Sequence, residues 1–358
     1  MDVAILKVAI VNAHYSVNLG GSEIQCHIIA SELVKRGYLV DYIAVSGYQE
    51  STEFPYRLLA VDKDSNAIIG ALDQVKPDIV YWRFNHRCFR KTFWTLRLKS
   101  KFIFSSSHLD DVTLWHAKSN LEDSLWFRPF NAIKKNIKSM INYATLLMCD
   151  YVLVNNSNHL KYILSSNKKF IANSIFTDLG FFEWPRPYFI WIGNIKRHKA
   201  PEAYLQACRA FDQAGVDFLI AGSIYDREYD HFKDEDSLPK NFYYLGQLEI
   251  TNANAAIKGA LALVHTCRPE GFPNVFLQAW ALGKPVVSLN FDPQGIIKEY
   301  GVGFHSVTPS QFLIDLKHVA KAIDLKDEYS RISLALTAVK FNRQKNIDSL
   351  IEVINEVI

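Results

Sequence analysis

The stretch that decides the fold is LALVHTCRPEGFPNVFLQAWALGKPVVSL, residues 261–289. Its first part, 261–266, is an apolar run that suits a buried parallel strand. Pro273 suits the first turn of a helix, and Gly283 favours the end of that helix. A second apolar run, 286–289, follows directly. The stretch therefore predicts a strand, a tight loop, a short helix and another strand.

The loop of this stretch is typical of an anion site. Gly271 gives the backbone freedom and carries no side chain, so a ligand can approach the main chain closely. A helix that begins at the carboxyl end of a parallel strand directs its N–H groups and its positive dipole end at whatever binds there. Glu270 on the loop and Gln278 about two turns into the helix could hold two parts of one polar ligand. They could equally be an acid that complements the helix dipole and an ordinary helix amide.

The first residues predict a βαβ unit. An apolar strand at 6–12 leads into a glycine pair at 20–21, a helix, and a second strand at 38–45. Ser22 and Gln25 have the spacing of a capping box. This order predicts a Rossmann-like sheet. The loop lacks the Gly-x-Gly-x-x-Gly spacing, so a dinucleotide cofactor is not expected.

The second half of the chain repeats the pattern. A strand at 188–192 leads into a loop at 193–199 and a helix at 201–214. Further strands are expected at 78–82, 102–106, 150–155, 218–221 and 241–245.

The length of 358 residues suggests two domains. The proline-containing segment 183–187 is the clearest linker, so we expect domains at 1–182 and 183–340. Residues 341–358 are expected to form a terminal helix with a core-packing face.

Composition narrows the class of protein. Hydrophobic residues make up 49% of the chain, and the formal net charge is only +3, too small to imply a nucleic-acid partner. The five cysteines have no Cys-x-x-Cys spacing, which indicates reduced thiols and a cytoplasmic location. We recognise no signal peptide and no transmembrane stretch. No pair of histidines has metal-ligand spacing, so no metal site is expected.

Two basic stretches contain aromatic or apolar residues. Each is either a solvated helix face or a contact with an anionic membrane or lipid phosphate. The first consists of Arg87, Arg90, Lys91, Arg97, Lys99 and Lys101 with Phe89, Phe93 and Trp94. The second consists of Trp126, Phe127, Arg128, Lys134, Lys135 and Lys138, with Ile133, Ile137, Ile141 and Ala144 on the other side of a predicted helix.

The run from Glu270 to Gln278 resembles the signature of the family 4 retaining glycosyltransferases. In that family two glutamates separated by seven residues span the nucleotide-sugar site. Glu270 matches the first glutamate, and Gly271-Phe272 match its usual followers. Gln278 stands in place of the second glutamate, whose role is to contact the ribose, and an amide can also bond hydroxyls.

The resemblance extends to other segments. Lys199 matches the family's diphosphate lysine, whereas Asn194 replaces the usual arginine; Arg197 or Arg268 could supply that charge. His108 matches a histidine that serves the donor sugar or the acceptor. The residues that the resemblance places at the donor diphosphate are Gly20, Gly21, Asn194, Arg197, Lys199, Phe272 and Asn274.

The resemblance implies the GT-B architecture: two facing Rossmann-like domains with the active site in the cleft between them. The first domain, 1–182, would bind the acceptor, the second, 183–340, would bind the nucleotide sugar, and the helix in 341–358 would pack across both domains. It implies retaining, metal-independent transfer of a sugar from a UDP- or GDP-linked donor to a saccharide or lipid-linked acceptor, without a cofactor. Glu270, His108 and Lys199 would be the catalytic residues. Surface polysaccharide or glycolipid assembly at the inner face of the cell membrane is the expected setting. A nucleotide-sugar epimerase and a non-catalytic nucleotide-sugar-binding scaffold stay open as alternatives.

Overall fold

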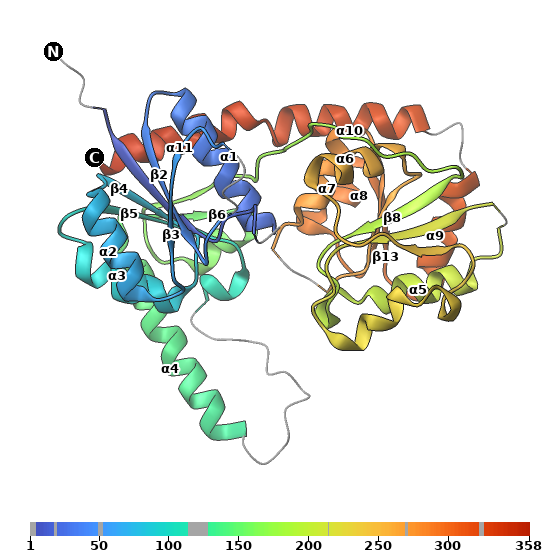
Figure 1. The fold of residues 1–358 in the computed structure, drawn as a ribbon, viewed down its shortest axis with the longest axis horizontal. Coiled ribbons are helices and arrows are strands. Elements are labelled where there is room, and N and C mark those ends of the chain that lie inside the picture. Colours follow the sequence, from blue (N-terminus) through green and yellow to red (C-terminus); the bar gives the residue numbers. More distant parts are fainter. Residues whose placement is uncertain are drawn as a thin grey trace. The chain divides into compact units, whose positions relative to one another are not determined.

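The computed structural model describes residues 5–17, 20–48, 53–113, 128–213, 215–268, 271–321 and 326–358; the side chains of 128–136 and 326 are outside this description. The chain forms two compact units (Figure 1). Unit 1 comprises Met1–Ser174 and Arg343–Ile358, and unit 2 comprises Ile175–Asn342. The units therefore divide after residues 174 and 342, whereas the sequence predicts domain boundaries after residues 182 and 340.

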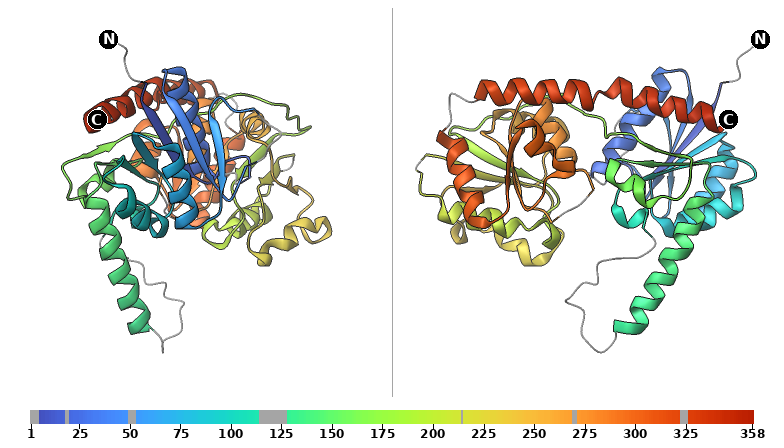
Figure 2. Two further views of the ribbon diagram at one scale, coloured as in Figure 1. Left: turned by 60° about the vertical axis from the view of Figure 1, so that its left-hand side comes forward. Right: turned by 180° about the vertical axis from the view of Figure 1, so that it is seen from behind.

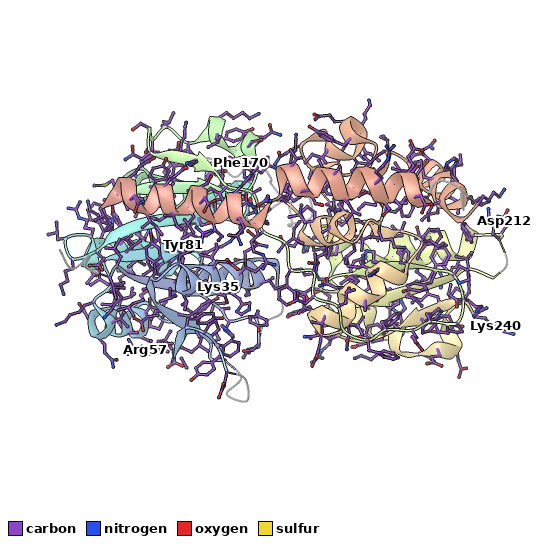
Figure 3. The ribbon with its side chains drawn as sticks, turned by 90° about the horizontal axis from the view of Figure 1, so that it is seen from above. Lys35, Arg57, Tyr81, Phe170, Asp212 and Lys240 are labelled. Carbon is purple, nitrogen blue, oxygen red and sulfur yellow. The ribbon has the colours of Figure 1, made fainter. Side chains whose placement is uncertain are left out.

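Unit 1 contains a parallel sheet of seven strands in the order β3-β2-β1-β4-β5-β6-β7. In Figure 3, Arg57 of β3, Tyr81 of β4 and Phe170 of β7 mark this order across the sheet. The strands are β1 (Lys7–Asn12), β2 (Leu39–Val45), β3 (Arg57–Val61), β4 (Ile79–Trp82), β5 (Lys101–Ser106), β6 (Tyr151–Val154) and β7 (Lys168–Phe170). The helices are α1 (Gly21–Lys35), α2 (Ser65–Val75), α3 (His86–Leu96), α4 (Arg128–Leu147) and α11 (Arg343–Val357).

The unit 1 sheet is buried on both faces because its side chains alternate between two cores. Ala9 and Val11 of β1 join the core under α2, α3 and α4, whereas Val8 and Ile10 join the core under α1 and α11. Helix α11 contributes Ile347, Leu350, Val353, Ile354 and Val357 to the second core. The expected core-packing face of the terminal helix is therefore confirmed.

Unit 2 contains a parallel sheet of six strands in the order β10-β9-β8-β11-β12-β13. The strands are β8 (Tyr188–Ile192), β9 (Asp217–Ala221), β10 (Phe242–Tyr244), β11 (Leu263–His265), β12 (Val286–Leu289) and β13 (Gly303–Ser306). The helices are α5 (Pro201–Ala210), α6 (Ile250–Gly259), α7 (Asn274–Ala281), α8 (Ile296–Tyr300), α9 (Pro309–Lys321) and α10 (Lys326–Lys340). The predicted fold class of two Rossmann-like α/β domains is confirmed.

The predicted capping box of the first helix is wrong. Helix α1 begins at Gly21, and its N-cap is Gly20, which has no side chain to cap the helix. Ser22 already lies in the first turn, where its hydroxyl accepts a 3.0 Å bond from the Asn12 side chain. Gln25 instead exchanges two 2.7 Å hydrogen bonds with the backbone of Ser174. Its amide therefore holds a distant segment rather than the helix end.

The first basic stretch behaves as an amphipathic helix of the globular core. On α3, Phe89 and Phe93 are buried, while Lys99 pairs with Asp73 at 2.7 Å. Trp94 remains exposed, with the Arg97 guanidinium 4.5 Å from its ring centroid. The solvated-face interpretation therefore describes most of this stretch.

The second basic stretch is only partly described. Trp126 and Phe127 are outside the described residues, as are the side chains of Arg128, Ile133, Lys134 and Lys135. Helix α4 projects away from the unit 1 sheet (Figures 1 and 2). Its described apolar residues Ile137 and Ile141 are exposed, whereas Tyr143 and Leu146 pack into the core.

Candidate functional site at the carboxyl ends of the strands

The unit 2 sheet has a topological switch point between β8 and β11. The chain proceeds from β8 outward to β9 and β10 on one side, and from β11 to β12 and β13 on the other. Open parallel sheets bind ligands outside the carboxyl ends of their strands at such a point. Residues 193–199 follow β8 there, and residues 266–274 follow β11. Both stretches predicted to bind the donor therefore begin at the same place in the sheet.

Side-chain and backbone hydrogen bonds join these two loops. The Thr266 hydroxyl donates to the carbonyl oxygen of Lys199 at 2.9 Å and accepts from the Trp191 indole at 2.9 Å. The backbone N–H of Arg268 donates to the carbonyl oxygen of His198 at 3.1 Å. Because Thr266 and Trp191 are buried, this connection fixes the backbone at Lys199 against the start of the second loop.

A close backbone approach shapes the loop after β8. Gly222, at the end of β9, has a φ of +146°, and a Cβ there would overlap the carbonyl oxygen of Gly193. The N–H of Gly222 donates to the carbonyl oxygen of Gly246 at 2.8 Å. The glycines that follow β9 and β10 are thus neighbours at the carboxyl edge of this sheet.

The basic residues of this edge have different surroundings. Lys199 is half-buried at the end of a short 3-10 helix, Arg197–Lys199. The Arg197 side chain is 69% exposed and lies 3.4 Å from a Glu228 carboxylate oxygen, so its charge is partly balanced. Asn194 is half-buried in the loop immediately after Gly193. Arg268 is exposed, and no hydrogen bond or ion pair of its side chain occurs among the described residues.

The loop before α7 is described only in part. Glu270, the predicted contact of the donor sugar, lies outside the described residues. The Phe272 ring is buried against Trp280 and Phe341, with centroid distances of 6.5 and 5.4 Å. Only the backbone of Phe272 is therefore available to a ligand. Asn274 is the first residue of α7, which has Pro273 as its N-cap and no side-chain cap.

Gln278, the predicted ribose contact, is held by a neighbouring amide. Its Nε2 donates to Asn254 Oδ1 at 2.9 Å. Asn254 is fully buried in α6, and its own Nδ2 donates to the carbonyl oxygens of Phe176 and Asp178 at 2.9 and 3.0 Å. The orientation of the Gln278 amide is thus fixed by a chain of bonds that reaches the segment before β8.

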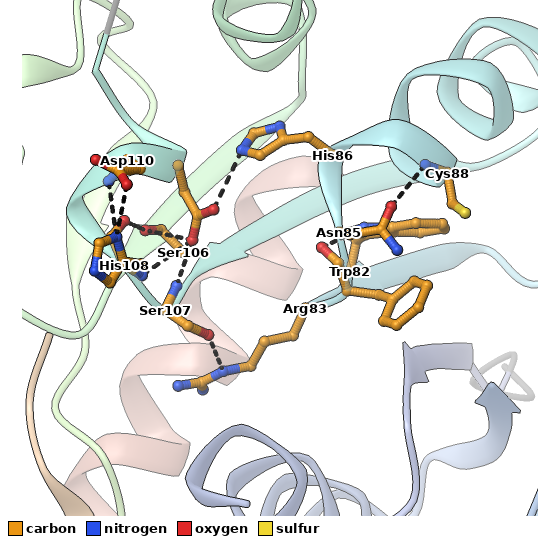
Figure 4. Close-up of polar contacts among 11 residues, drawn as sticks. Trp82, Arg83, Asn85, His86, Cys88, Ser106, Ser107, His108 and Asp110 are labelled. Atoms are coloured by element: carbon orange, nitrogen blue, oxygen red, sulfur yellow. Dashed lines mark hydrogen bonds and ion pairs between the residues drawn. The ribbon is translucent and has the colours of Figure 1, made fainter. Parts of the chain in front are cut away.

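The predicted residues of unit 1 lie at the carboxyl edge of its sheet. Gly20 and Gly21 form the N-terminus of α1, the helix that follows β1 in the chain. His108 follows β5 and caps a short 3-10 helix, Leu109–Asp111, by accepting a 3.2 Å bond from the N–H of Asp110 (Figure 4). The His108 side chain is 47% exposed, as a residue that meets a substrate must be. The roles of these residues toward donor and acceptor stay predictions.

Asp111 and His159 lie near His108. Asp111 accepts 3.0 Å bonds from the N–H groups of Ser107 and His108, and its carboxylate lies 3.5 Å from His86 Nε2. Burial raises the pKa of Asp111, but the bonds from His86 and these N–H groups outweigh it and leave the pKa below its usual value. Burial, with the charge of His108, lowers the pKa of His159 to about 4. The edge thus holds a fixed carboxylate and a neutral histidine beside the exposed His108.

Two residues of these edges were not predicted. Asn254 has no distinguishing pattern in the sequence, since its importance comes from contacts with distant segments. Arg83 does have one: it is a charged residue directly after the apolar strand β4. Within the part of the chain that the structure describes, no group of three His, Cys, Asp or Glu side chains could hold a metal ion. None of the described helices combines the length and apolar character needed to cross a membrane.

Comparison with known proteins identifies the class. Residues 186–323, which lie within unit 2, match the family model described as glycosyl transferases group 1. The chain thus carries a group 1 glycosyltransferase domain, which confirms the resemblance found in the sequence. No curated protein matches the sequence significantly.

Solved structures match the whole fold at low sequence identity. HepE from Anabaena, in complex with UDP and glucose, has a TM-score of 0.74 and 13% identity over 98% of this chain and 99% of its own. Sucrose-phosphate synthase from Thermosynechococcus elongatus has a TM-score of 0.77 and 14% identity over 98% of this chain and 99% of its own. WaaG, described as a glycosyltransferase involved in lipopolysaccharide biosynthesis, has a TM-score of 0.69 and 11% identity over 96% of this chain and 99% of its own. The chain has the GT-B fold of these enzymes.

Proposed function

We propose that this protein is a retaining glycosyltransferase that moves a sugar from a nucleotide donor to a saccharide or lipid-linked acceptor. The group 1 domain supports the transferase class. The HepE structure holds UDP with glucose, which favours a UDP-linked donor over a GDP-linked one.

One observation supports the donor site most strongly. The loop of Lys199 and the loop that begins α7 are joined by the Thr266 and Arg268 hydrogen bonds of 2.9 and 3.1 Å at the switch point of the unit 2 sheet. A lysine and a helix N-terminus at the same place form a site suited to a diphosphate.

The proposed chemistry is stabilisation of the leaving group. A nucleoside diphosphate departs with growing negative charge as the bond to the sugar breaks. Lys199 and the first N–H groups of α7 would stabilise that charge with groups already in position. Glu270 would hold the donor sugar, and Gln278 the ribose. We propose no protein nucleophile, no metal and no cofactor for this reaction.

The proposed setting is glycolipid or surface polysaccharide synthesis on the cytoplasmic side of a membrane. WaaG, described as acting in lipopolysaccharide biosynthesis, shares the fold and supports this setting. Ile137, Met140 and Ile141 on α4 are 52, 46 and 45% exposed, with Lys138 among them. Apolar side chains with neighbouring lysines suit contact with an anionic lipid surface.

The test is calorimetric titration of the full chain with UDP, GDP and ADP, with EDTA and with added Mg²⁺. We expect UDP to bind without metal and Lys199→Ala to weaken binding by tenfold or more, because a charge-assisted bond contributes about 1.5–3 kcal/mol. Lys258→Ala is the matched control, because Lys258 is an exposed lysine on α6. Absence of binding by all three nucleotides would reject the proposal.

The fixed Gln278 amide favours one alternative, a non-catalytic nucleotide-sugar-binding scaffold, because its N–H is already bonded to Asn254. Incubation with UDP-glucose separates the possibilities. Slow release of UDP and free sugar supports a transferase, binding without any turnover supports the scaffold, and a changed sugar on intact nucleotide supports an epimerase.

A further inference from the structure

Arg83 lies at the switch point of the unit 1 sheet. It follows β4 directly, and its N–H donates to the carbonyl oxygen of Val11 on β1 at 3.1 Å. Between β1 and β4 the strand order reverses, with β2 and β3 on one side and β5 to β7 on the other. This is the second position in the chain where an open parallel sheet is suited to hold a ligand.

The Arg83 guanidinium is buried without an opposite charge. The residue is 8% exposed. Its Nε donates to the Ser107 hydroxyl at 3.2 Å (Figure 4), and its Nη2 donates to Asn173 Oδ1 at 3.2 Å. Both partners are neutral, and no ion pair among the described residues includes Arg83. The Tyr81 hydroxyl is a further neighbour of the guanidinium. A guanidinium has five N–H donors, so donors still remain for another partner.

Glu23 on α1 acts, like Arg83, on the pKa of Cys26, but no ion pair joins Glu23 and Arg83 among the described residues. Two further carboxylates of unit 1 have other partners. Asp111 accepts from the N–H groups of Ser107 and His108 and faces His86. Glu32, buried on α1, pairs with Lys35 at 2.9 Å and lies 3.7 Å from Arg343. Because a buried charge is costly unless it is paired, the missing negative charge is expected from a ligand.

A small cavity adjoins Arg83. Its polar lining residues include Gln25, Arg83, Ser105, Asn155, Asn173 and Ser174, and apolar side chains such as Ile29, Leu153 and Leu350 also line it. Its volume of about 20 Å³ accommodates about one or two oxygen atoms but no sugar ring. Asn155 is 6% exposed, and its Oδ1 has no hydrogen-bond partner among the described residues. The cavity thus offers a cation for anionic oxygens and a free acceptor for a hydroxyl.

We propose that Arg83 binds the acidic group of an anionic acceptor, a phosphate or a carboxylate whose oxygens enter this cavity. Asn155 Oδ1 accepts a hydroxyl of the same group or of the adjoining sugar. The assignment of this ligand as an acceptor rests on the glycosyltransferase function proposed above, whereas the anion site itself does not. The other source of anionic oxygens is the donor diphosphate, and the experiment separates the two.

The experiment measures the thermal unfolding midpoint of the full chain in phosphate, acetate and chloride at equal ionic strength. For the wild type we expect phosphate or acetate at roughly ten times its Kd to raise the midpoint by about 3–6 °C over chloride. Arg83→Met removes the charge at similar length, and we expect it to lose this response. In chloride it should unfold no lower than the wild type, because an unpaired buried charge is gone. Arg97→Met, which changes the exposed C-cap residue of α3, should keep the response.

Titration with UDP then distinguishes an acceptor anion from the donor diphosphate at this site. Unchanged UDP affinity in Arg83→Met supports the acceptor assignment, and a tenfold loss assigns the anion to the donor and overturns it. A wild type without anion response, together with a destabilised Arg83→Met, makes Arg83 a structural residue. Arg83→Lys checks that result: the proposal requires it to fold and to retain part of the anion response. Failure of the wild type to bind any nucleotide rejects the transferase function but leaves the anion response to be judged separately.

Discussion

Gln278 donates through its side-chain amide to Asn254, and Asn254 can accept that bond because its own amide nitrogen donates to the carbonyl oxygens of Phe176 and Asp178. A glutamate at position 278, the residue usual in the resembling family, has no hydrogen to donate. The glutamine at 278 and the asparagine at 254 are therefore complementary, so the departure from the family signature has a structural partner.

We expect Gln278→Glu to lower the free energy of unfolding by about 1–3 kcal/mol at neutral pH, since it places a carboxylate against a buried carbonyl oxygen. Urea unfolding measures this. Gln278→Ala and Asn254→Ala should be coupled in a double-mutant cycle by at least about 0.5 kcal/mol. Strict additivity of the two single variants would show that the bond contributes nothing.

Arg268 rather than Arg197 is expected to replace the arginine missing at Asn194. The Arg197 charge is shared with Glu228, whereas the described residues offer the Arg268 side chain no partner. Arg268→Ala should weaken UDP binding by about tenfold, in line with ~1.4 kcal/mol for one phosphate contact, and Arg197→Ala by much less. Calorimetry measures both, with Arg209→Ala on α5 as a control. The reverse order of effects would assign the role to Arg197.

Gly222 is expected to be intolerant of any side chain. Its φ of +146° and the overlap of a Cβ with the Gly193 carbonyl oxygen require the loop after β8 to move. Gly222→Ala should cost at least about 3 kcal/mol of unfolding free energy. Gly301 has a φ of +65° with nothing within 4 Å of a Cβ, so Gly301→Ala should cost only about 1–2 kcal/mol. Equal losses in the two variants would contradict the close approach.

Stability is expected to fall in mild acid because of buried histidines near β1. His14 Nε2 and His27 Nδ1 both bond the Tyr56 hydroxyl, at 3.0 and 2.6 Å. Burial, with the charge of His27, lowers the pKa of His14 from 6.5 to about 4. Burial, with the charge of Arg343, lowers the pKa of His27 likewise to about 4. Below pH 6.5 the unfolded chain therefore binds protons that the folded chain does not.

The free energy of unfolding should accordingly rise with pH between about 4 and 6.5, with ~1.4 kcal/mol for each unit by which a pKa is lowered. Chemical unfolding at a series of pH values measures this slope. His27→Phe should reduce it, and the exposed-residue variant His305→Asn serves as a control. An unchanged slope in His27→Phe would show that this histidine is already protonated in the fold.

Helix α4 is expected to contribute to membrane binding. Ile137 and Ile141 are 52 and 45% exposed, and replacing both by serine should lower partition onto anionic vesicles about tenfold or more, because each buried apolar side chain contributes about 1.5–3 kcal/mol. Flotation with phosphatidylglycerol vesicles measures the bound fraction. Val339→Ser, which removes an exposed apolar side chain on α10, should change little. Equal binding by the double variant would exclude this face.

The sequence predicted the interior of both sheets better than their edges. Strands β8 and β12 occur at the predicted residues, because strands buried on both faces require continuous apolar runs. The strands β3, β7 and β13 were missed, and all three are edge strands with mostly half-buried or exposed residues. Lys168-Lys169-Phe170 has no apolar run to recognise.

The candidate site was predictable where one loop carries the pattern. Lys199 and the residues around α7 could be found from glycines, prolines and a lysine in short stretches. Arg83 and Asn254 could not be given a role from the sequence, because they bond distant residues. Asn173 lies 90 residues from Arg83, and the two carbonyl groups that Asn254 bonds lie 76 and 78 residues from it. The aromatic partners of Phe272 are likewise distant in part, so its ring was not recognised as a core residue.

The return of the chain to unit 1 at α11 sets an order of events during synthesis. Arg36, the C-cap residue of α1, pairs with Asp348 at 2.6 Å. Ile347, Leu350 and Val353 complete one of the two cores of unit 1. Those residues leave the ribosome after all of unit 2. Unit 1 begins to be translated before unit 2, yet one of its cores can be completed only afterwards, so β1 and α1 must wait with an uncovered apolar face until α11 emerges.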